Sequence, residues 1–276
     1  MINPETIRGM RDLYDACMRK NSWVLAFSAH LEHDVSRYVA HNGETAMLMW
    51  HQFGAEPAAL EARIQTELAW FRGRSKLLYW KVYGHDQPPG LGDRLAQLGA
   101  DAEDNAVLHM ASVAEVCERL AFETQSQRLQ SGSSRADVMR AQAVWVDVWP
   151  ESADEQRIWG ELYAGALDKL TDSPQSEQGA RFWTAGSDAD AGIANAAGYL
   201  IHAPNSPVAL LCGGAVRKAA RNQGLYKALL KARAEWAQSR GAKWLAIEAS
   251  PMSAPIVQSL GFVPITSLVF YKFKLS

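Results

Sequence analysis

The chain has 276 residues, of which 48% are hydrophobic and 21% charged, the proportions typical of a globular protein with one large or two ordinary domains. A formal net charge of −2 gives no reason to expect nucleic acid or an anionic membrane as a partner. The three cysteines are few and far apart, which favours a reducing compartment without a disulfide framework. The first residues lack a basic signal-peptide region, and no early apolar run could span a bilayer, so we expect a cytoplasmic location.

The first 112 residues alternate between helical and extended patterns. Apolar residues recur at helical spacing over residues 5–20, and Asn42-Gly43 between two apolar runs predicts a β-hairpin. Pro57 opens a helix that continues to about Arg72. Downstream we expect a strand over 76–83, a turn-rich loop over 84–90, a helix over 91–98 and a strand over 106–110.

Residues 113–137 are interpreted as a helical linker region. A helical pattern over 113–129 is followed by Ser131-Gly-Ser-Ser134, the most linker-like stretch of the chain. We therefore expect an N-terminal domain over residues 1–112 and a C-terminal domain over residues 138–276. Within the second domain the pattern predicts helices over 141–149 and 154–170, strands over 180–185, 193–202 and 208–216, and loops over 171–179 and 186–192.

One stretch of the second domain has the pattern of a phosphate-binding turn. The apolar run 208–216 reads as a buried strand, and the hexapeptide Arg221-Asn222-Gln223-Gly224-Leu225-Tyr226 leads into a helix that ends near Arg240. Unpaired amides and the positive end of the helix dipole favour phosphate or pyrophosphate at such a helix start. Neither G-x-x-x-x-G-K-[ST] nor G-x-G-x-x-G is present. An ordinary strand-to-helix turn is the alternative interpretation.

This hexapeptide resembles motif A of the GNAT superfamily of acyl-CoA N-acyltransferases, whose usual form is [R/Q]-x-x-G-x-[G/A]. Tyr226 departs from that form. The downstream order of strand 243–249, helix 253–260, Gly261-Phe262 and a further strand resembles motif B of the same family. The resemblance covers roughly residues 138–276. It implies an α+β GNAT fold, in which a mixed, mostly antiparallel sheet is flanked by helices.

The resemblance also implies acetyl-CoA as cosubstrate. The residues carried over for acyl-CoA binding are Gly214, Ala215, Val216, Arg221, Asn222, Gln223, Gly224, Leu225, Tyr226 and Ser253. Gly224 allows close approach of the backbone to the pyrophosphate, and Arg221 adds charge or braces the loop. Ser253 also reads as the N-cap of the helix that follows it.

The first half repeats part of this pattern. Residues 76–100, a strand, loop and helix ending in Leu98-Gly99, parallel residues 243–262 in the order of their elements. No phosphate-loop sequence precedes the first copy, so we interpret residues 1–112 as a partial, degenerate GNAT-like repeat that does not bind acyl-CoA. An unrelated α+β cap domain is the competing interpretation.

The catalytic groups are less clear from the sequence. Many family members carry a tyrosine four residues before the Gly of Gly-Phe, a position that Val257 occupies here. Tyr226 and Tyr271 are candidate replacements for this general acid, and each also fits a structural role. Glu248, in the strand expected to splay, is a candidate general base or amine-binding group, and equally fits a solvated strand carboxylate.

Candidate residues for the acceptor site come from both halves: Trp80, Tyr83, His85, Trp145 and Trp149. His85-Asp86 next to two prolines also fits a rigid turn in which Asp86 caps the following helix, the reading we favour. The histidines are scattered without zinc-site spacing, so we expect no metal.

Together these patterns predict an N-acetyltransferase that acts on a small-molecule amine by direct attack in a ternary complex; a homodimer is compatible with the sequence. Two alternatives stay open. One is a non-catalytic acyl-CoA-binding sensor or interaction protein that has lost its general acid. The other is a tandem GNAT of the aminoacyl-transferring or thiol-cofactor-synthesising kind.

Overall fold

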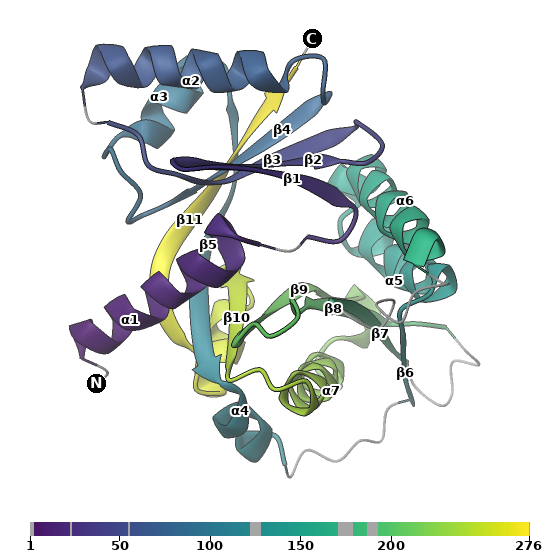
Figure 1. The fold of residues 1–276 in the computed structure, drawn as a ribbon. Helices are drawn as coiled ribbons and strands as arrows, with labels where there is room; N and C mark the ends of the chain where they lie inside the picture. Colours follow the sequence, from purple (N-terminus) through teal and green to yellow (C-terminus); the bar gives the residue numbers. More distant parts are fainter. Residues whose placement is uncertain are drawn as a thin grey trace.

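The computed structural model describes residues 3–22, 24–54, 56–121, 128–170, 179–186 and 193–275. Its strands form one continuous sheet in the order β1-β2-β3-β4-β11-β5-β10-β9-β8-β7-β6 (Figure 1). The strands are β1 (Phe27–Glu32), β2 (Val35–Ala40), β3 (Thr45–His51), β4 (Leu77–Tyr83), β5 (Asp101–Ser112), β6 (Arg128–Gly132), β7 (Ala180–Gly186), β8 (Ala196–Ile201), β9 (Val208–Val216), β10 (Trp244–Ala249) and β11 (Val263–Lys274). The helices are α1 (Pro4–Tyr14), α2 (Pro57–Phe71), α3 (Leu91–Gln97), α4 (Val113–Arg119), α5 (Arg135–Val148), α6 (Ala153–Leu170), α7 (Leu225–Ser239) and α8 (Ala254–Ser259).

The two halves of the sheet repeat one arrangement. In the first half, β1, β2 and β3 are antiparallel, and α2 connects β3 to the parallel strand β4. In the second half, β7, β8 and β9 are antiparallel, and α7 connects β9 to the parallel strand β10. A helix is the usual connection between parallel neighbours, because the chain must return to the same end of the sheet. Each half therefore contains a single parallel pair next to an antiparallel meander.

The halves exchange their last strands. β5, which ends the first half, lies between β10 and β11, and it is antiparallel to both. β11, which ends the chain, lies between β5 and β4. The long yellow strand β11 and the teal strand β5 cross the middle of the molecule in Figure 1. Each half thus completes its sheet with a strand from the other.

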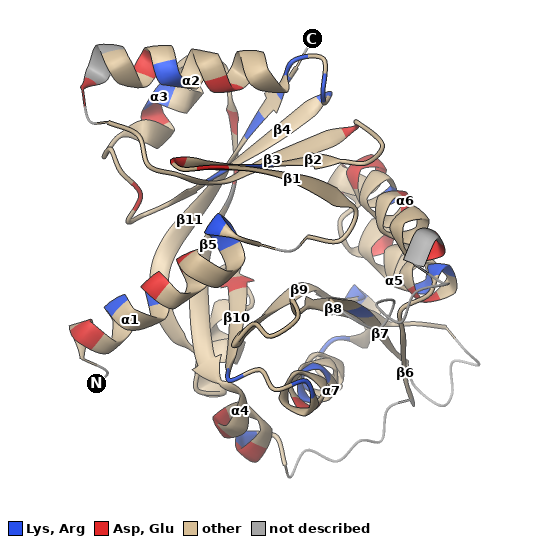
Figure 2. Ribbon diagram, in the orientation of Figure 1, with Lys and Arg blue, Asp and Glu red and all other residues tan. Residues whose placement is uncertain are grey.

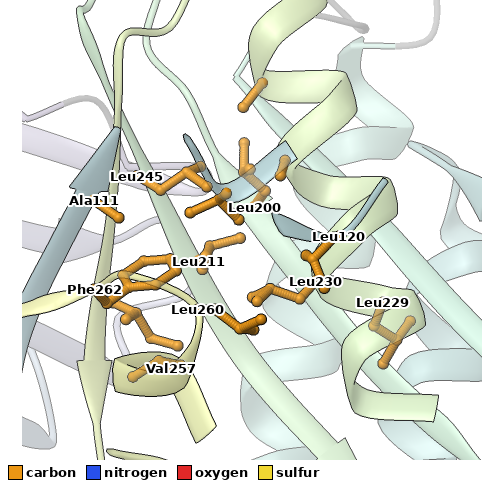
Figure 3. Packing of buried hydrophobic residues seen from close by; sticks show 14 of the residues in the cluster. Ala111, Leu120, Leu200, Leu211, Leu229, Leu230, Leu245, Val257, Leu260 and Phe262 are labelled. Carbon is orange, nitrogen blue, oxygen red and sulfur yellow. The ribbon is translucent and has the colours of Figure 1, made fainter. Parts of the chain in front are cut away.

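Helices cover both faces of this sheet. α7 packs on one face of the second half, where Leu211, Leu245, Val257, Leu260 and Phe262 form a buried cluster with Leu229 and Leu230 (Figure 3). α5 and α6 cover the opposite face of the second half. The first helix, α1, and the π-helical turn Asp15–Lys20 that continues it lie over the exchanged strands, burying Met10, Tyr14 and Met18.

Charged residues of both signs are interspersed on the helices, and the central strands are largely uncharged (Figure 2). None of the helices in the described ranges has the length and hydropathy of a bilayer-spanning segment.

Most of the expected elements are present, with two errors. The helix expected over 113–129 is wrong, because α4 ends at Arg119 and Arg128–Gly132 forms the edge strand β6, paired with β7. The edge strand β1 was also missed. Residues 122–127 of the expected linker, and residues 171–178 and 187–192 of the expected loops, lie outside the described residues.

Candidate functional site

The turn between β9 and α7 leads into a helix start that no side chain caps. Asn222 and Gly224 adopt positive φ angles of 63° and 77°. Arg221 is exposed, and its Nε donates to the carbonyl of Val216 at 3.4 Å, which ties the turn to the end of β9. The first bond within α7 runs from Ala228 N to Gly224 O at 2.9 Å, and no side chain caps the helix. The amides of its first turn therefore have no acceptor within the helix, as an anion site requires.

Next to this turn, β9 and β10 stop pairing. Their parallel register runs from Val208 and Trp244 to Leu211 and Ile247. Beyond that point Glu248 continues to pair with Leu108 of β5 and no longer has a partner in β9. The parallel pair therefore separates at the end of the sheet from which α7 begins. A gap between strands leaves backbone groups available to an extended ligand.

β9 also contains a β-bulge, just beyond the last residue that pairs with β10. Ala215 pairs with Ala197, and Cys212 pairs with Tyr199, so two glycines of β9 stand opposite one residue of β8. Gly213 has a φ of 58°, and its carbonyl accepts from Trp145 Nε1 at 2.7 Å. A Cβ at Gly213 would lie 2.9 Å from a ring carbon of Tyr199. Both the conformation and the space therefore require glycine.

Tyr226, in the first turn of α7, lies against Gly214 of this bulge. A Cβ at Gly214 would lie 3.0 Å from Cε2 of the Tyr226 ring, so the two residues are in contact distance. Burial raises the pKa of the Tyr226 phenol, and the charge of Arg233 lowers it less. The phenol consequently keeps its proton at neutral pH. Gly214 is the second residue of the bulge, and Ala215 and Val216 follow it and lead into the turn.

Glu248 lies at the point of separation, in a buried polar cluster. Its carboxylate accepts from Tyr14 at 2.9 Å, from Tyr83 at 2.6 Å, and from Lys81 Nζ at 2.8 Å on each oxygen. Burial favours the protonated form, but Lys81 and the two hydroxyls outweigh it and hold the pKa of Glu248 below its ordinary value. The carboxylate is therefore ionised at neutral pH. Sequence reasoning found Glu248 and Tyr83 and missed Tyr14 and Lys81.

His85 lies beside that cluster. Its Nε2 is 2.9 Å from Asp15, and its Nδ1 is 3.2 Å from Thr266 Oγ1. The guanidinium of Arg19 contacts His85 at 3.3 Å and stacks 4.0 Å from the centroid of the Tyr83 ring.

Asp86 does not cap α3, contrary to expectation. It accepts from Tyr83 N at 2.9 Å and from Arg19 at 2.8 Å, while Gly90 precedes α3. The expected turn itself is present, because Asp86 N donates to Tyr83 O at 2.9 Å. The buried cation thus attracts Asp86 away from the helix start.

Trp80 and Tyr271 are paired neighbours on the other face of the sheet, in the buried cluster under α2 and α3. A Cβ at Gly92 of α3 would lie 2.1 Å from the Tyr271 hydroxyl, so this phenol packs directly against the α3 backbone. Since side chains alternate along β4, Trp80 points away from the face that carries Lys81 and Tyr83. The structure does not bring Trp80 or Tyr271 together with Glu248.

The remaining candidates lie on different elements. Trp145 is buried and holds the bulge, whereas Trp149 ends α5 and packs against the same cluster as α6. Ser253 precedes α8 without capping it, and its hydroxyl donates to Ser250 O at 3.3 Å. Val257 is fully buried and packs beside Phe262 (Figure 3).

The equivalent gap in the first half is filled. β3 and β4 stop pairing after Leu48 and Trp80, and the buried side chain of Arg19 enters there, donating to Met49 O at 2.9 Å. The helix after β3 starts with Glu56 at the N-cap and Pro57 at the first position. This places an acidic side chain and a missing amide where α7 has Gly224 and the amide of Leu225. The first half therefore lacks the features of a pyrophosphate turn.

Comparison with known families identifies the second half. Residues 142–262 match the acetyltransferase (GNAT) family. The chain carries a GNAT domain. The match contains the turn, the bulge, Glu248 and the buried Val257, and it ends at Phe262. No curated protein matches the chain.

Solved structures show that the first half is a second copy of the GNAT fold. A tandem GNAT protein from the clavulanic acid biosynthesis pathway is 14% identical with a TM-score of 0.60, over 99% of this chain and 95% of that one. A GCN5-related N-acetyltransferase from Kribbella flavida is 15% identical with a TM-score of 0.60, over 90% and 89% of the two chains. A functionally unknown conserved protein from Staphylococcus epidermidis is 10% identical with a TM-score of 0.66, over 94% and 100%. The expected tandem GNAT fold is confirmed, and the unrelated cap domain is excluded.

Proposed function

We propose that this protein is an acyl-CoA-dependent N-acyltransferase that transfers acetyl from acetyl-CoA to the amine of a small molecule. One observation carries the proposal. The parallel strands of the GNAT domain separate at the same end of the sheet at which the uncapped Gly224 turn begins α7. An extended ligand with a pyrophosphate at one end suits this pairing of an anion site and an open strand edge.

Each part of acetyl-CoA has a counterpart in the site. The pyrophosphate would bind the first-turn amides of α7, with Arg221 supplying charge at the rim. The pantetheine arm would lie along Gly214, Ala215 and Val216 in the gap. The thioester carbonyl would accept from an amide of the bulge, which stabilises the oxyanion that forms when an amine attacks.

Two residues of the site are assigned roles in the reaction. Glu248 is ionised and lies where the strands separate, so we propose that it attracts and orients the amine of the acceptor. Tyr226 lies against the bulge and keeps its proton at neutral pH, so it is the better placed of the two tyrosine candidates to protonate the leaving thiolate. Direct attack balances the reaction: the C–N bond forms, the C–S bond breaks, and the amine loses its proton to solvent. Tyr226 gives its proton to the leaving thiolate and regains one from solvent.

A non-catalytic acyl-CoA-binding protein is the second candidate. Val257 supplies no hydroxyl at the usual position, and both oxygens of Glu248 are already occupied by donors. The tandem fold is equally compatible with an aminoacyl-transferring or thiol-cofactor-synthesising enzyme.

A thiol-release assay separates these functions. The purified protein is incubated with acetyl-CoA and a panel of small amines, amino acids and amino sugars, and free CoA is followed with a thiol reagent. Amine-dependent release above the hydrolytic background supports the enzyme. Binding of acetyl-CoA without release from any amine would contradict it and favour the non-catalytic alternative. Glycyl and cysteinyl acceptors in the same panel test the other tandem enzymes.

A further inference from the structure

Arg233 is a fully buried cation in α7, and it forms no ion pair within the described residues. Its Nε donates to Leu229 O at 3.1 Å within the helix, and its Nη1 donates to Cys212 O at 3.2 Å and to Tyr199 O at 3.4 Å. No partner in the described part of the chain accepts from its Nη2. A buried charge that rests only on backbone carbonyls is costly, so a helix facing an apolar core would ordinarily carry leucine here.

The sheet is shaped to admit this guanidinium. A Cβ at Gly198 would lie 2.7 Å from Nη1 and 3.0 Å from Cζ of Arg233. Gly198 is also the residue of β8 that stands opposite the bulge. The glycine and the arginine therefore fit each other, directly beneath the two glycines of β9.

The positions of the Tyr199 and Cys212 carbonyls determine the direction in which the Gly213 N–H points. A single nitrogen of Arg233 reaches both Tyr199 O and Cys212 O, so both carbonyls face the seam between β8 and β9. The peptide bond from Cys212 to Gly213 is trans, which directs the Gly213 N–H opposite to the Cys212 carbonyl. That N–H therefore faces the β10 edge of β9, where pairing has already ended.

We infer that Arg233 is a positioning residue that strengthens the Gly213 amide as a donor for the thioester carbonyl. The inference rests on the proposed function. A charge-assisted hydrogen bond to one end of a peptide unit polarises the unit, and the N–H at its other end becomes a stronger donor. Arg233 acts from beneath the sheet through this one peptide unit, without touching the substrate. It also holds the bulge in register.

Infrared difference spectroscopy of bound acetyl-CoA tests this directly, using cosubstrate labelled with ¹³C at the acetyl carbonyl. A polarised carbonyl absorbs at lower frequency than the free thioester. We expect a downshift in the wild-type protein, a clearly smaller one in Arg233→Met, and a largely retained one in Arg233→Lys, which keeps a charged donor. Arg240→Met, at the exposed end of the same helix, is the matched control and should match the wild type.

Affinity and turnover complete the test. Arg233→Met should bind desulfo-CoA about as tightly as the wild type, while kcat falls about tenfold, less than the roughly 100-fold loss of a whole oxyanion donor. Should Arg233→Met not fold, Arg233→Gln and Arg233→Lys carry the same comparison between a neutral and a charged donor. An unchanged downshift in the neutral variants would overturn the inference alone. A wild-type protein that does not bind acetyl-CoA would overturn the proposed function as well.

Discussion

Lys81 and Glu248 occupy equivalent positions in the two halves of the sheet, and their side chains form an ion pair of 2.8 Å. Lys81 follows the last residue of β4 that pairs with β3, and Glu248 follows the last residue of β10 that pairs with β9. Each therefore stands where its own parallel pair separates. The ion pair joins the filled gap of the first half to the open gap of the second, so the degenerate copy contributes a charge to the candidate site.

The first prediction concerns this pair. Glu248→Gln leaves Lys81 buried without a counter-ion, which should lower the free energy of unfolding by about 3–5 kcal/mol at pH 7. The variant carrying both Glu248→Gln and Lys81→Met should regain much of that loss. Urea denaturation measures each value. Equal stability of the single variant and the wild type would show that the pair is not formed in solution.

The pH dependence of stability has a definite sign at Glu248. Its pKa is lowered by folding, so its contribution is complete above the unfolded value of about 4.3 and is lost as pH falls through the folded value. The stability difference between wild type and Glu248→Gln should therefore shrink between about pH 5 and the onset of acid unfolding. Urea midpoints at pH 7, 5 and 4 give this difference. A stability difference that increases as the pH falls would contradict the lowered pKa of Glu248.

The two tyrosine candidates give opposite predictions. Tyr226→Phe should lower kcat about 100-fold if its phenol protonates the thiolate, with little change in desulfo-CoA affinity. Tyr271→Phe should leave turnover unchanged, because this phenol packs against Gly92 on the other face of the sheet. Thiol release by the two variants is compared under the same conditions. A loss confined to Tyr271→Phe would reverse the assignment.

The strand exchange predicts that the N-terminal domain does not fold alone. Residues 1–112 contain β5 without either of its partners, and Leu108 and Met110 would lose their cover. A fragment of these residues should give collapsed amide dispersion in an NMR spectrum and no cooperative urea transition. The full chain is the control. A dispersed spectrum from the fragment would show that the first copy is an independent domain.

The sequence predicted the parts of the fold that depend on neighbouring residues. The apolar run 208–216, Gly224 and the helical stripe that includes Leu229 were enough to place the turn, since strand, loop and helix follow each other along the chain. β1 was missed although Phe27, Ala29 and Leu31 alternate with polar residues. An alternation over only six residues is a weak signal, and only Phe27 of this edge strand is buried.

The exchange of β5 and β11 was beyond sequence reasoning. Alternation along a strand shows which face is buried but not which strands are its neighbours. Two charged residues within apolar patterns were nevertheless visible signals. Lys81 interrupts the run 77–83, and Arg233 falls on the buried side of α7. Both are buried polar groups at the candidate site.

The central claim is that the Gly224 turn and the adjoining gap bind acyl-CoA, and one titration tests it most directly. Desulfo-CoA is titrated calorimetrically into the wild type, Gly224→Val and Gly241→Val. The control is matched, because Gly241 has a φ of 84° and lies just beyond the other end of α7, so valine is strained at both positions. We predict micromolar binding by the wild type and by Gly241→Val, and none by Gly224→Val. Unchanged affinity in Gly224→Val, or no binding by the wild type, would contradict the claim.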